Sequence, residues 1–286
     1  MILKMRQAIF KQQLLKTVLF VLMLSRHLAA SCQSTPLPNA FAHNDYSHKR
    51  PLFDALDNGY TNIEADIFLK DNDFVVAHIN PFFKQGQGRT LELLYLQPLM
   101  KLITKNQGQV YRGYNSPVTL LVDIKTDAEA TYRALKPLLE KYRSILTRYE
   151  DGKVYPKQVT IVLSGNKPFK SITAETRRLA FIDEDLKSNN RDTSSTNVYA
   201  MASCKYSRLL RWNGEGAMPI GEKQLLLSYV TAAHKYGKRV RLWASPENLM
   251  VWQELLNCGV DLINTDKLAM LKNFLLSGGV LYAKAN

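Results

Sequence analysis

Short apolar runs alternate with longer amphipathic segments over most of this chain. The apolar runs have the length of buried strands, whereas the amphipathic segments repeat apolar residues every three or four positions, as helices do. Eight principal strands are predicted, at 40–44, 62–68, 118–125, 158–164, 179–183, 198–203, 239–244 and 261–265. The second strand continues past a polar turn at 71–73 into a further apolar run, 74–79.

Helical patterns separate many of these strands. They cover 51–58, 91–106, 128–148, 222–236, 246–256 and 267–276. Strands that alternate with helices pair in parallel through right-handed crossovers. Eight such units predict an α/β fold, a (β/α)₈ barrel of the TIM type, with the least clear pattern between 165 and 198. An open doubly wound sheet is the alternative, but the Gly-rich first turn of a dinucleotide fold is missing.

The first 31 residues have the composition of a targeting segment. A basic stretch without acids is followed by an apolar core at 17–24 and by small residues at 29–31. This order predicts a signal peptide, because the apolar core is too short to span a membrane. We therefore expect an exported protein that is periplasmic, secreted or anchored as a lipoprotein. Lipidation of Cys32 and ordinary cleavage after Ala30 both stay open.

After this segment, 32–39 form a short N-terminal stretch and 40–286 a single domain. Removal of 1–31 takes away five basic residues and no acid, which lowers the formal net charge from +13 to +8. A basic domain suits anionic substrates or an anionic membrane surface. No Lys/Arg-rich block with interleaved aromatic residues is present, so nucleic-acid binding is not predicted, and nothing indicates an obligate protein partner. Cys204 and Cys258 do not form a recognisable disulfide framework.

Two histidines and two acids lie within 36 residues, at His43, Glu64, Asp66 and His78. Because strand side chains alternate between faces, Glu64 and Asp66 point the same way, about 7 Å apart. Carboxylates so placed can hold one hard cation, and histidines move protons near neutral pH. Solvated acids on an exposed strand are the plain alternative, but the flanking histidines favour a metal-assisted acid/base site.

The third strand ends in a second polar pair, Asp123 and Lys125, which share one face. Catalytic side chains of TIM-type barrels gather at the carboxyl ends of the strands. Asp123 is therefore expected to be a third ligand of the cation, and Lys125 a phosphate contact. A purely structural ion pair between the two is the alternative.

Six motifs, in this order at these strand ends, carry a resemblance to a known superfamily. They are Ala-His-Asn-Asp-Tyr at 42–46, Ile-Glu-Ala-Asp-Ile at 63–67, Val-Ala-His at 76–78, Val-Asp-Ile-Lys at 122–125, Arg-Leu-Trp-Ala at 241–244 and Gly-Val-Asp-Leu-Ile-Asn-Thr-Asp at 259–266. From about 40 to 267 the chain resembles glycerophosphodiester phosphodiesterases and phosphatidylinositol-specific phospholipases C. It is most similar to the bacterial exported, phosphodiesterase-like branch of that superfamily.

The resemblance implies a barrel that hydrolyses glycerophosphodiesters or phospholipid headgroups with one divalent cation, Ca²⁺ or Mg²⁺. By that analogy Glu64, Asp66 and Asp123 ligate the ion, and His43 and His78 form the acid/base pair. The attacking group, either a substrate hydroxyl that leaves a cyclic phosphate or water, stays open, as does the leaving alcohol. Zinc is less suited, because the expected ligands are carboxylates.

The expected substrate contacts depart from the family pattern. Glycerophosphodiester phosphodiesterases usually have a phosphate-binding Arg after the first histidine, and here Asn44 stands in that place. The contact is therefore lost or passes to Lys125, Arg50 or an unidentified residue. Trp243 is expected to line the mouth, with an ordinary buried aromatic as the alternative.

A different class of function also stays open. The loss of that Arg favours an exported barrel that binds an anionic ligand or a lipid headgroup without cleaving it. A metal-dependent amidohydrolase is disfavoured, because His43 has no second histidine two positions away.

Overall fold

A computed structural model of the protein describes residues 16, 34–80, 88–188 and 198–278. The chain divides into two compact units, Met1–Gln33 and Ser34–Asn286, and the second unit holds the fold. The predicted signal peptide, apart from residue 16, and Cys32 lie outside the described residues. Export and lipidation therefore stay predictions. Within the described segments, no helix is both long and apolar enough to cross a bilayer.

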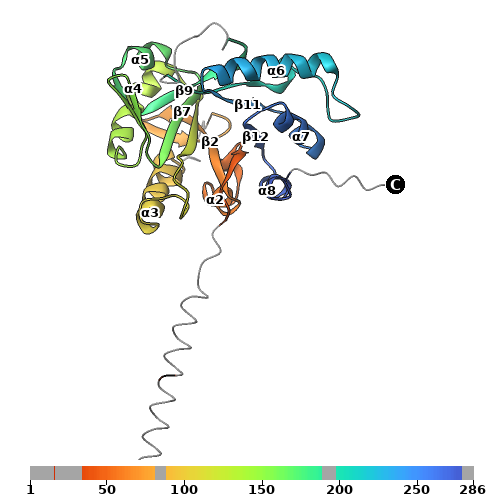
Figure 1. The fold of residues 1–286 in the computed structure, drawn as a ribbon. Helices are drawn as coiled ribbons and strands as arrows, with labels where there is room; N and C mark the ends of the chain where they lie inside the picture. The colour runs from red at the N-terminus through yellow and green to blue at the C-terminus, as the bar shows by residue number, and fades with distance from the viewer. Residues whose placement is uncertain (1–15, 17–33, 81–87, 189–197, 279–286) are drawn as a thin grey trace, which may run out of the picture. The chain divides into compact units, whose positions relative to one another are not determined.

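Eight parallel strands close into a barrel (Figure 1). In spatial order they are β1 (Leu37–Ala42), β2 (Tyr60–Lys70), β4 (Val118–Ile124), β7 (Val159–Gly165), β9 (Ala180–Asp185), β10 (Tyr199–Lys205), β11 (Arg239–Trp243) and β12 (Leu262–Thr265). The barrel is closed because β1 pairs in parallel with both β2 and β12. The predicted (β/α)₈ barrel is confirmed, with all eight principal strands in place, and the open sheet is wrong.

Helices surround the strands, as Figure 1 shows. They are α2 (Phe53–Asp57), α3 (Gln97–Lys105), α4 (Ala128–Lys141), α5 (Phe169–Ala174), α6 (Ile220–Lys235), α7 (Leu249–Asn257) and α8 (Leu268–Leu276). A π-helical turn, Glu92–Leu96, leads into α3. The sequence did not predict α5, which is only six residues long.

The predicted helix at 128–148 is too long at its carboxyl end. After α4 the chain enters a small antiparallel sheet of β5 (Arg148–Glu150), β6 (Lys153–Tyr155) and β8 (Arg177–Arg178). Asp151 and Gly152 join β5 to β6 with φ values of 47° and 85°. Asp-Gly with two positive φ angles favours a tight hairpin turn, which is the local reason for this sheet.

The predicted extension of the second strand is confirmed as β3 (Asp73–Val76), which pairs antiparallel with β2. Asp71 and Asn72 make the turn between them, again with positive φ angles, 49° and 66°. The hairpin returns the chain from the carboxyl end of β2 to the level of Asp66, where the Ala77 amide donates to the Asp66 carbonyl at 3.2 Å. This local geometry places His78 beside the acids of β2.

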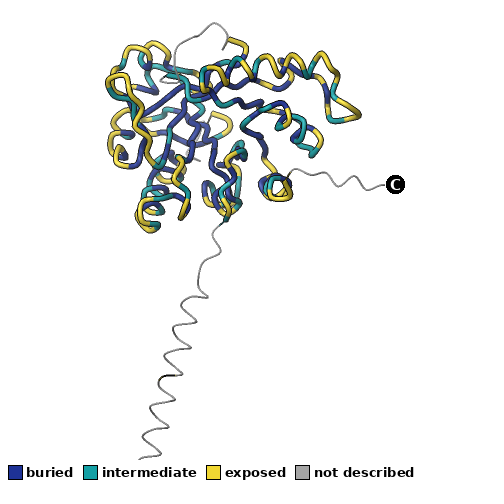
Figure 2. Tube along the Cα trace, in the orientation of Figure 1, coloured by how far each residue is buried: buried dark blue, intermediate teal, exposed yellow. Residues whose placement is uncertain are grey.

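Apolar side chains fill the barrel and the layer between strands and helices. A cluster of Phe41, Leu121, Val162, Met201 and Leu262, each from a different strand, is separate from the larger outer core. Because strand side chains alternate, the opposite faces of the same strands pack against the helices. Figure 2 shows buried residues along the strands and exposed residues mainly on the outer helices and loops.

Candidate active site

A cavity of about 390 Å³ lies at the carboxyl ends of the barrel strands. It is lined by eight of the nine side chains that the sequence singled out, namely His43, Asn44, Glu64, Asp66, His78, Asp123, Lys125 and Trp243. A second cavity, of about 450 Å³, opens at the amino-terminal end, where Asn39, Arg239 and Asp261 line it. Catalytic groups of TIM-type barrels lie at the carboxyl end, and the acid cluster is at that end here.

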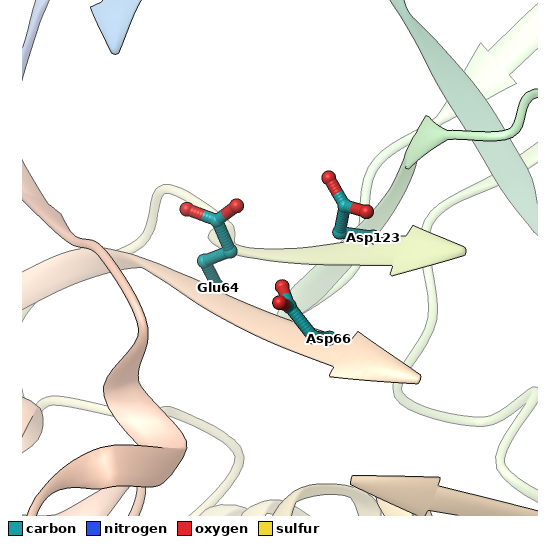
Figure 3. Close-up of side chains that lie close together, drawn as sticks. All are labelled: Glu64, Asp66 and Asp123. Atoms are coloured by element: carbon teal, nitrogen blue, oxygen red, sulfur yellow. The ribbon is translucent and has the colours of Figure 1, made fainter. Parts of the chain in front are cut away.

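Three carboxylates converge in this cavity (Figure 3). Glu64 and Asp66 come from β2, and Asp123 comes from the neighbouring β4, where it is in register with Asp66. One oxygen of each carboxylate lies within 4.8 Å of the others. Hard cations bind carboxylate oxygens at about 2.0–2.6 Å, so a single ion can reach all three.

The burial of these acids supports a cation site. Glu64 and Asp66 are 5% and 2% exposed, and burial is the main reason why the pKa of each lies above its usual range. Asp66 Oδ1 is buried without a hydrogen-bond partner. An unpaired buried carboxylate oxygen is costly unless a cation or donor reaches it. The donor set therefore fits a divalent cation that prefers oxygen ligands.

Basic side chains already offset part of this negative charge. The Lys125 ammonium lies 3.0 Å from Asp66 Oδ2 and 2.9 Å from Asp123 Oδ1. Lys125 thus lines the cavity as expected, but its charge is directed to the candidate metal ligands. Burial by itself would lower the pKa of Lys125, but the two carboxylates outweigh it and the pKa is raised.

Neighbouring strands hold Asp123 in place. The Ser164 hydroxyl donates to Asp123 Oδ2 at 2.9 Å. The next residue, Gly165, has a φ of 66°, and a Cβ there would overlap Asp123 Oδ1 and lie 2.6 Å from the Ile124 carbonyl oxygen. Only glycine fits this approach without displacing the carboxylate. Neither residue was predicted from the sequence, because their role depends on β7 lying beside β4.

His43 follows β1 and is oriented by an acid from the other end of the chain. Its Nδ1 lies 2.8 Å from Asp266 Oδ1. Burial by itself would lower the pKa of His43, but the hydrogen bond to Asp266, with the Glu64 and Asp266 charges, raises it above its usual value. The same hydrogen bond is the main reason why the Asp266 pKa is lowered.

Glu247 fixes the turn that carries Asp266. Its Oε1 accepts hydrogen bonds from the Asp266 amide and the Thr265 hydroxyl, both at 2.6 Å. Asp266 stands in the last of the six motifs without a predicted role, and Glu247 was not predicted from the sequence. Their function depends on β12 closing against β1, which a linear pattern does not show.

His78 is connected to the acids by Tyr46. The Tyr46 hydroxyl lies 2.7 Å from Asp66 Oδ2, 2.6 Å from Asn44 Oδ1 and 3.1 Å from His78 Nδ1. Burial is the main reason why the Tyr46 pKa is raised, so the hydroxyl stays protonated and can donate. The His78 side chain is 70% exposed, and its Nδ1 lies 3.6 Å from Asp66 Oδ2. Tyr46 lies within the first motif, but its role in the site was not predicted from the sequence.

The structure does not bring Arg50 to the cavity. Its exposed guanidinium contacts Asp54 at 2.8 Å and Asp57 at 2.6 Å, both on α2. Arg50 lies three residues before α2 begins, so these contacts tie it to that helix and not to the cavity. The expectation that Arg50 contacts substrate is therefore corrected.

The other two expected substrate contacts do line the cavity. The Asn44 backbone is left-handed, with φ at 47°, and its side-chain amide lies 3.0 Å from His43 Nδ1. The Asn44 amide oxygen faces the Tyr46 hydroxyl, and its amide nitrogen lies beside His43. Trp243 lines the cavity and is 37% exposed, as expected for a residue at its mouth. The alternative, an ordinary buried aromatic, is wrong.

Arg241 joins the acids to the opposite wall of the cavity. It is 3% exposed, and its NH1 lies 3.1 Å from Glu64 Oε2 while its NH2 lies 3.7 Å from Asp183 Oδ2. Asp183 also accepts the Ser203 hydroxyl, and burial is the main reason why the pKa of Asp183 is raised. Arg241 stands in one of the six motifs, but its contacts with acids on β2 and β9 were not predicted from the sequence.

Comparison with known proteins identifies a family. A model of the AIM6-like phosphodiesterase domain matches residues 33–183, slightly more than half of the chain. The matched region contains the three clustered acids, both cavity histidines and Lys125. Arg241 and Asp266 lie beyond it.

Several fungal proteins named "Altered inheritance of mitochondria protein 6" are similar to this chain. The protein of Eremothecium gossypii is 30% identical over 276 residues, which cover 83% of this chain and 69% of the relative. For Lachancea thermotolerans the identity is 28%, over 81% of this chain and 64% of the relative. For Saccharomyces cerevisiae it is 29%, over 84% of this chain and 71% of the relative.

These relatives give no support to the bacterial exported branch that the resemblance favoured. They agree with the broader expectation of a phosphodiesterase-like barrel. From the family match and the similarity to these proteins, the chain belongs to the AIM6-like phosphodiesterase domain family.

Proposed function

We propose that this chain hydrolyses phosphodiesters with the help of one divalent cation, Ca²⁺ or Mg²⁺. The observation that carries this proposal is the convergence of Glu64, Asp66 and Asp123, with one oxygen of each within 4.8 Å of the others. His43 and His78 line the same cavity, so groups that can bind a cation and groups that can move protons are together.

A glycerophosphodiester or a phospholipid headgroup is the proposed substrate. The net charge, +8 without the first 31 residues, favours an anionic ligand, and a cavity of about 390 Å³ is within the size range of small-molecule sites. Export through a signal peptide, with or without a lipid on Cys32, remains part of the proposal on the basis of the first 31 residues alone.

The three acids would hold the cation. When bound, it would offset negative charge on a non-bridging phosphate oxygen. Tyr46 and Ser164 hydrogen-bond to two of the three acids and fix their carboxylates.

His43 is the proposed general base. If its Nδ1–H donates to Asp266 at 2.8 Å, Nε2 is left free to accept a proton. The raised pKa of His43 makes that nitrogen a stronger base. The proton comes from the attacking group, either a hydroxyl of the substrate or water.

His78 is the proposed general acid. Its Nδ1 lies beside the Tyr46 hydroxyl at 3.1 Å, which leaves Nε2 to donate a proton to the leaving oxygen. General acid and base steps typically contribute roughly 10²–10⁴-fold each.

The test is turnover of a panel of diesters, including bis(p-nitrophenyl) phosphate, by the purified protein under Ca²⁺ or Mg²⁺ titration. Phosphorus NMR would separate cyclic from open products. His43→Gln and His78→Gln should each lower kcat by roughly 10²–10⁴-fold. His234→Gln is the matched control, because His234 pairs with Asp261 at 2.8 Å and does not line the cavity.

Cation binding is measured separately by calorimetry. Asp66→Asn should weaken it, since Asp66 is one of the three clustered acids. Cation binding without cleavage of any diester would refute the proposed phosphodiesterase activity. It would favour the alternative function, a barrel that binds an anionic ligand without cleaving it.

A further inference from the structure

Besides a metal ion, a phosphodiester site usually offers a basic side chain to the phosphate. Asn44, which stands where the family resemblance implied a phosphate-binding Arg, is neutral, and Arg50 lies away from the cavity. Four Lys and Arg residues line the cavity among the described residues, namely Lys125, Lys167, Arg208 and Arg241. Their existing partners show which of them is available.

Three of the four are paired with carboxylates. Lys125 lies at 2.9 and 3.0 Å from two candidate metal ligands. Arg208 donates from NH1 to both oxygens of Asp185, at 3.1 and 3.0 Å. Arg241 is buried between two acids of the barrel. An anion that approached these groups would have to compete with existing ion pairs.

Lys167 differs from the other three. Its Nζ donates to the backbone carbonyl oxygen of Asp183 at 2.6 Å, and that oxygen carries no net charge. No ion pair within 4.0 Å joins this ammonium to a carboxylate in the described part of the chain; its charge acts only at longer range on the buried Asp183 carboxylate, and the Phe169 ring centroid is 6.0 Å away. An ammonium has three donors, and the Asp183 carbonyl uses one of them.

The position of Lys167 suits a ligand held at the acid cluster. It follows β7, which lies beside β4, and Ser164 on β7 hydrogen-bonds to Asp123. The side chain is only partly buried, so a ligand in the cavity can reach it. A phosphodiester that binds near three acids needs an attractive positive charge on another side.

We propose that Lys167 is the phosphate-binding cation of this cavity and that it contacts a non-bridging oxygen of the substrate phosphodiester. This inference rests on the proposed function for the identity of the substrate. The anion-binding role itself does not require turnover. Phosphate affinity and diester cleavage are therefore measured separately.

The first measurement is the affinity of the full-length protein for inorganic phosphate, by calorimetry or by line broadening in phosphorus NMR. Lys167→Gln should weaken phosphate binding roughly 10- to 100-fold, the loss expected for one charge-assisted hydrogen bond. Lys167→Arg should restore most of the affinity, because it keeps the positive charge. Lys170→Gln is the matched control: Lys170 is exposed, lies three residues further along and does not line the cavity.

The second measurement is the kinetics of a cleaved diester. Loss of a contact made equally to the bound substrate and to the transition state raises KM and leaves kcat nearly unchanged. We expect that pattern for Lys167→Gln and unchanged constants for Lys170→Gln.

Equal phosphate affinity in the wild type and Lys167→Gln would overturn the assignment, even if diesters are cleaved. Equal weakening by Lys170→Gln would overturn it too, because the effect would then come from surface charge. If the wild type cleaves no diester but Lys167→Gln alone weakens phosphate binding, the proposed enzyme fails and the anion site stands.

Discussion

Arg241 and Arg50 each contact two carboxylates, but they differ in burial, and this difference predicts opposite effects on stability. Arg241 and its partners Glu64 and Asp183 have side chains that are 4%, 7% and 4% exposed. The Arg50 side chain is 56% exposed. Replacing either arginine with Met removes the charge while keeping a side chain of comparable length.

The cost of Arg241→Met follows from the two acids that it leaves behind. Removing one partner of a buried ion pair typically lowers the free energy of unfolding by about 3–5 kcal/mol, because the remaining buried charge loses its counter-ion. The distance of 3.1 Å between Arg241 NH1 and Glu64 Oε2 places this pair in that class. For a domain of this size such a loss corresponds to a fall in Tm of roughly 10 °C.

The assay is urea unfolding followed by tryptophan fluorescence, in EDTA so that added cations do not replace the lost charge. Arg50→Met is the control, and we expect its unfolding midpoint to match the wild type, since exposed pairs contribute little. Glu64→Gln in the Arg241→Met background should recover part of the lost stability, because it removes one of the unpaired acids. Two results would contradict this explanation. Either Arg241→Met unfolds at the same urea concentration as the wild type, or Glu64→Gln lowers the stability of Arg241→Met further instead of restoring part of it.

Two further predictions concern the groups that hold the site. Asp266→Asn should lower the His43 pKa, measured by NMR of labelled histidine, and move the acidic limb of the pH–rate profile to lower pH. Because the folded-state pKa of His43 is raised, its stabilising effect is fully present below the usual histidine pKa of 6.5 and is lost as pH rises through the raised pKa. The stability gap between wild type and Asp266→Asn should therefore shrink on going from pH 6 to pH 9, and a gap that widens would contradict the assignment. Gly165→Ala should weaken cation binding at Asp123 while the barrel stays folded, and unchanged calorimetric affinity would show that the carboxylate is free to move.

Local patterns in the sequence were sufficient for the elements and for the core of the site. The alternation in 63–67 places Glu64 and Asp66 on one face, because a strand has a period of two residues. The turn at Asp71 and Asn72 returns the chain along β2 and places His78 beside them. A local signal also existed for one feature that was not predicted, because Asp151-Gly152 marks the small hairpin.

The side chains that contact these acids and histidines from distant parts of the sequence could be identified only from the closed barrel. Asp266 reaches His43 across 223 positions, and Arg241 reaches Glu64 across 177. Each contact exists because β1 pairs with β12 on one side and β2 on the other, and that closure depends on the packed interior as a whole. Periodicity describes which way a side chain points from its own strand, whereas the identity of its neighbour across the barrel is a property of the tertiary structure.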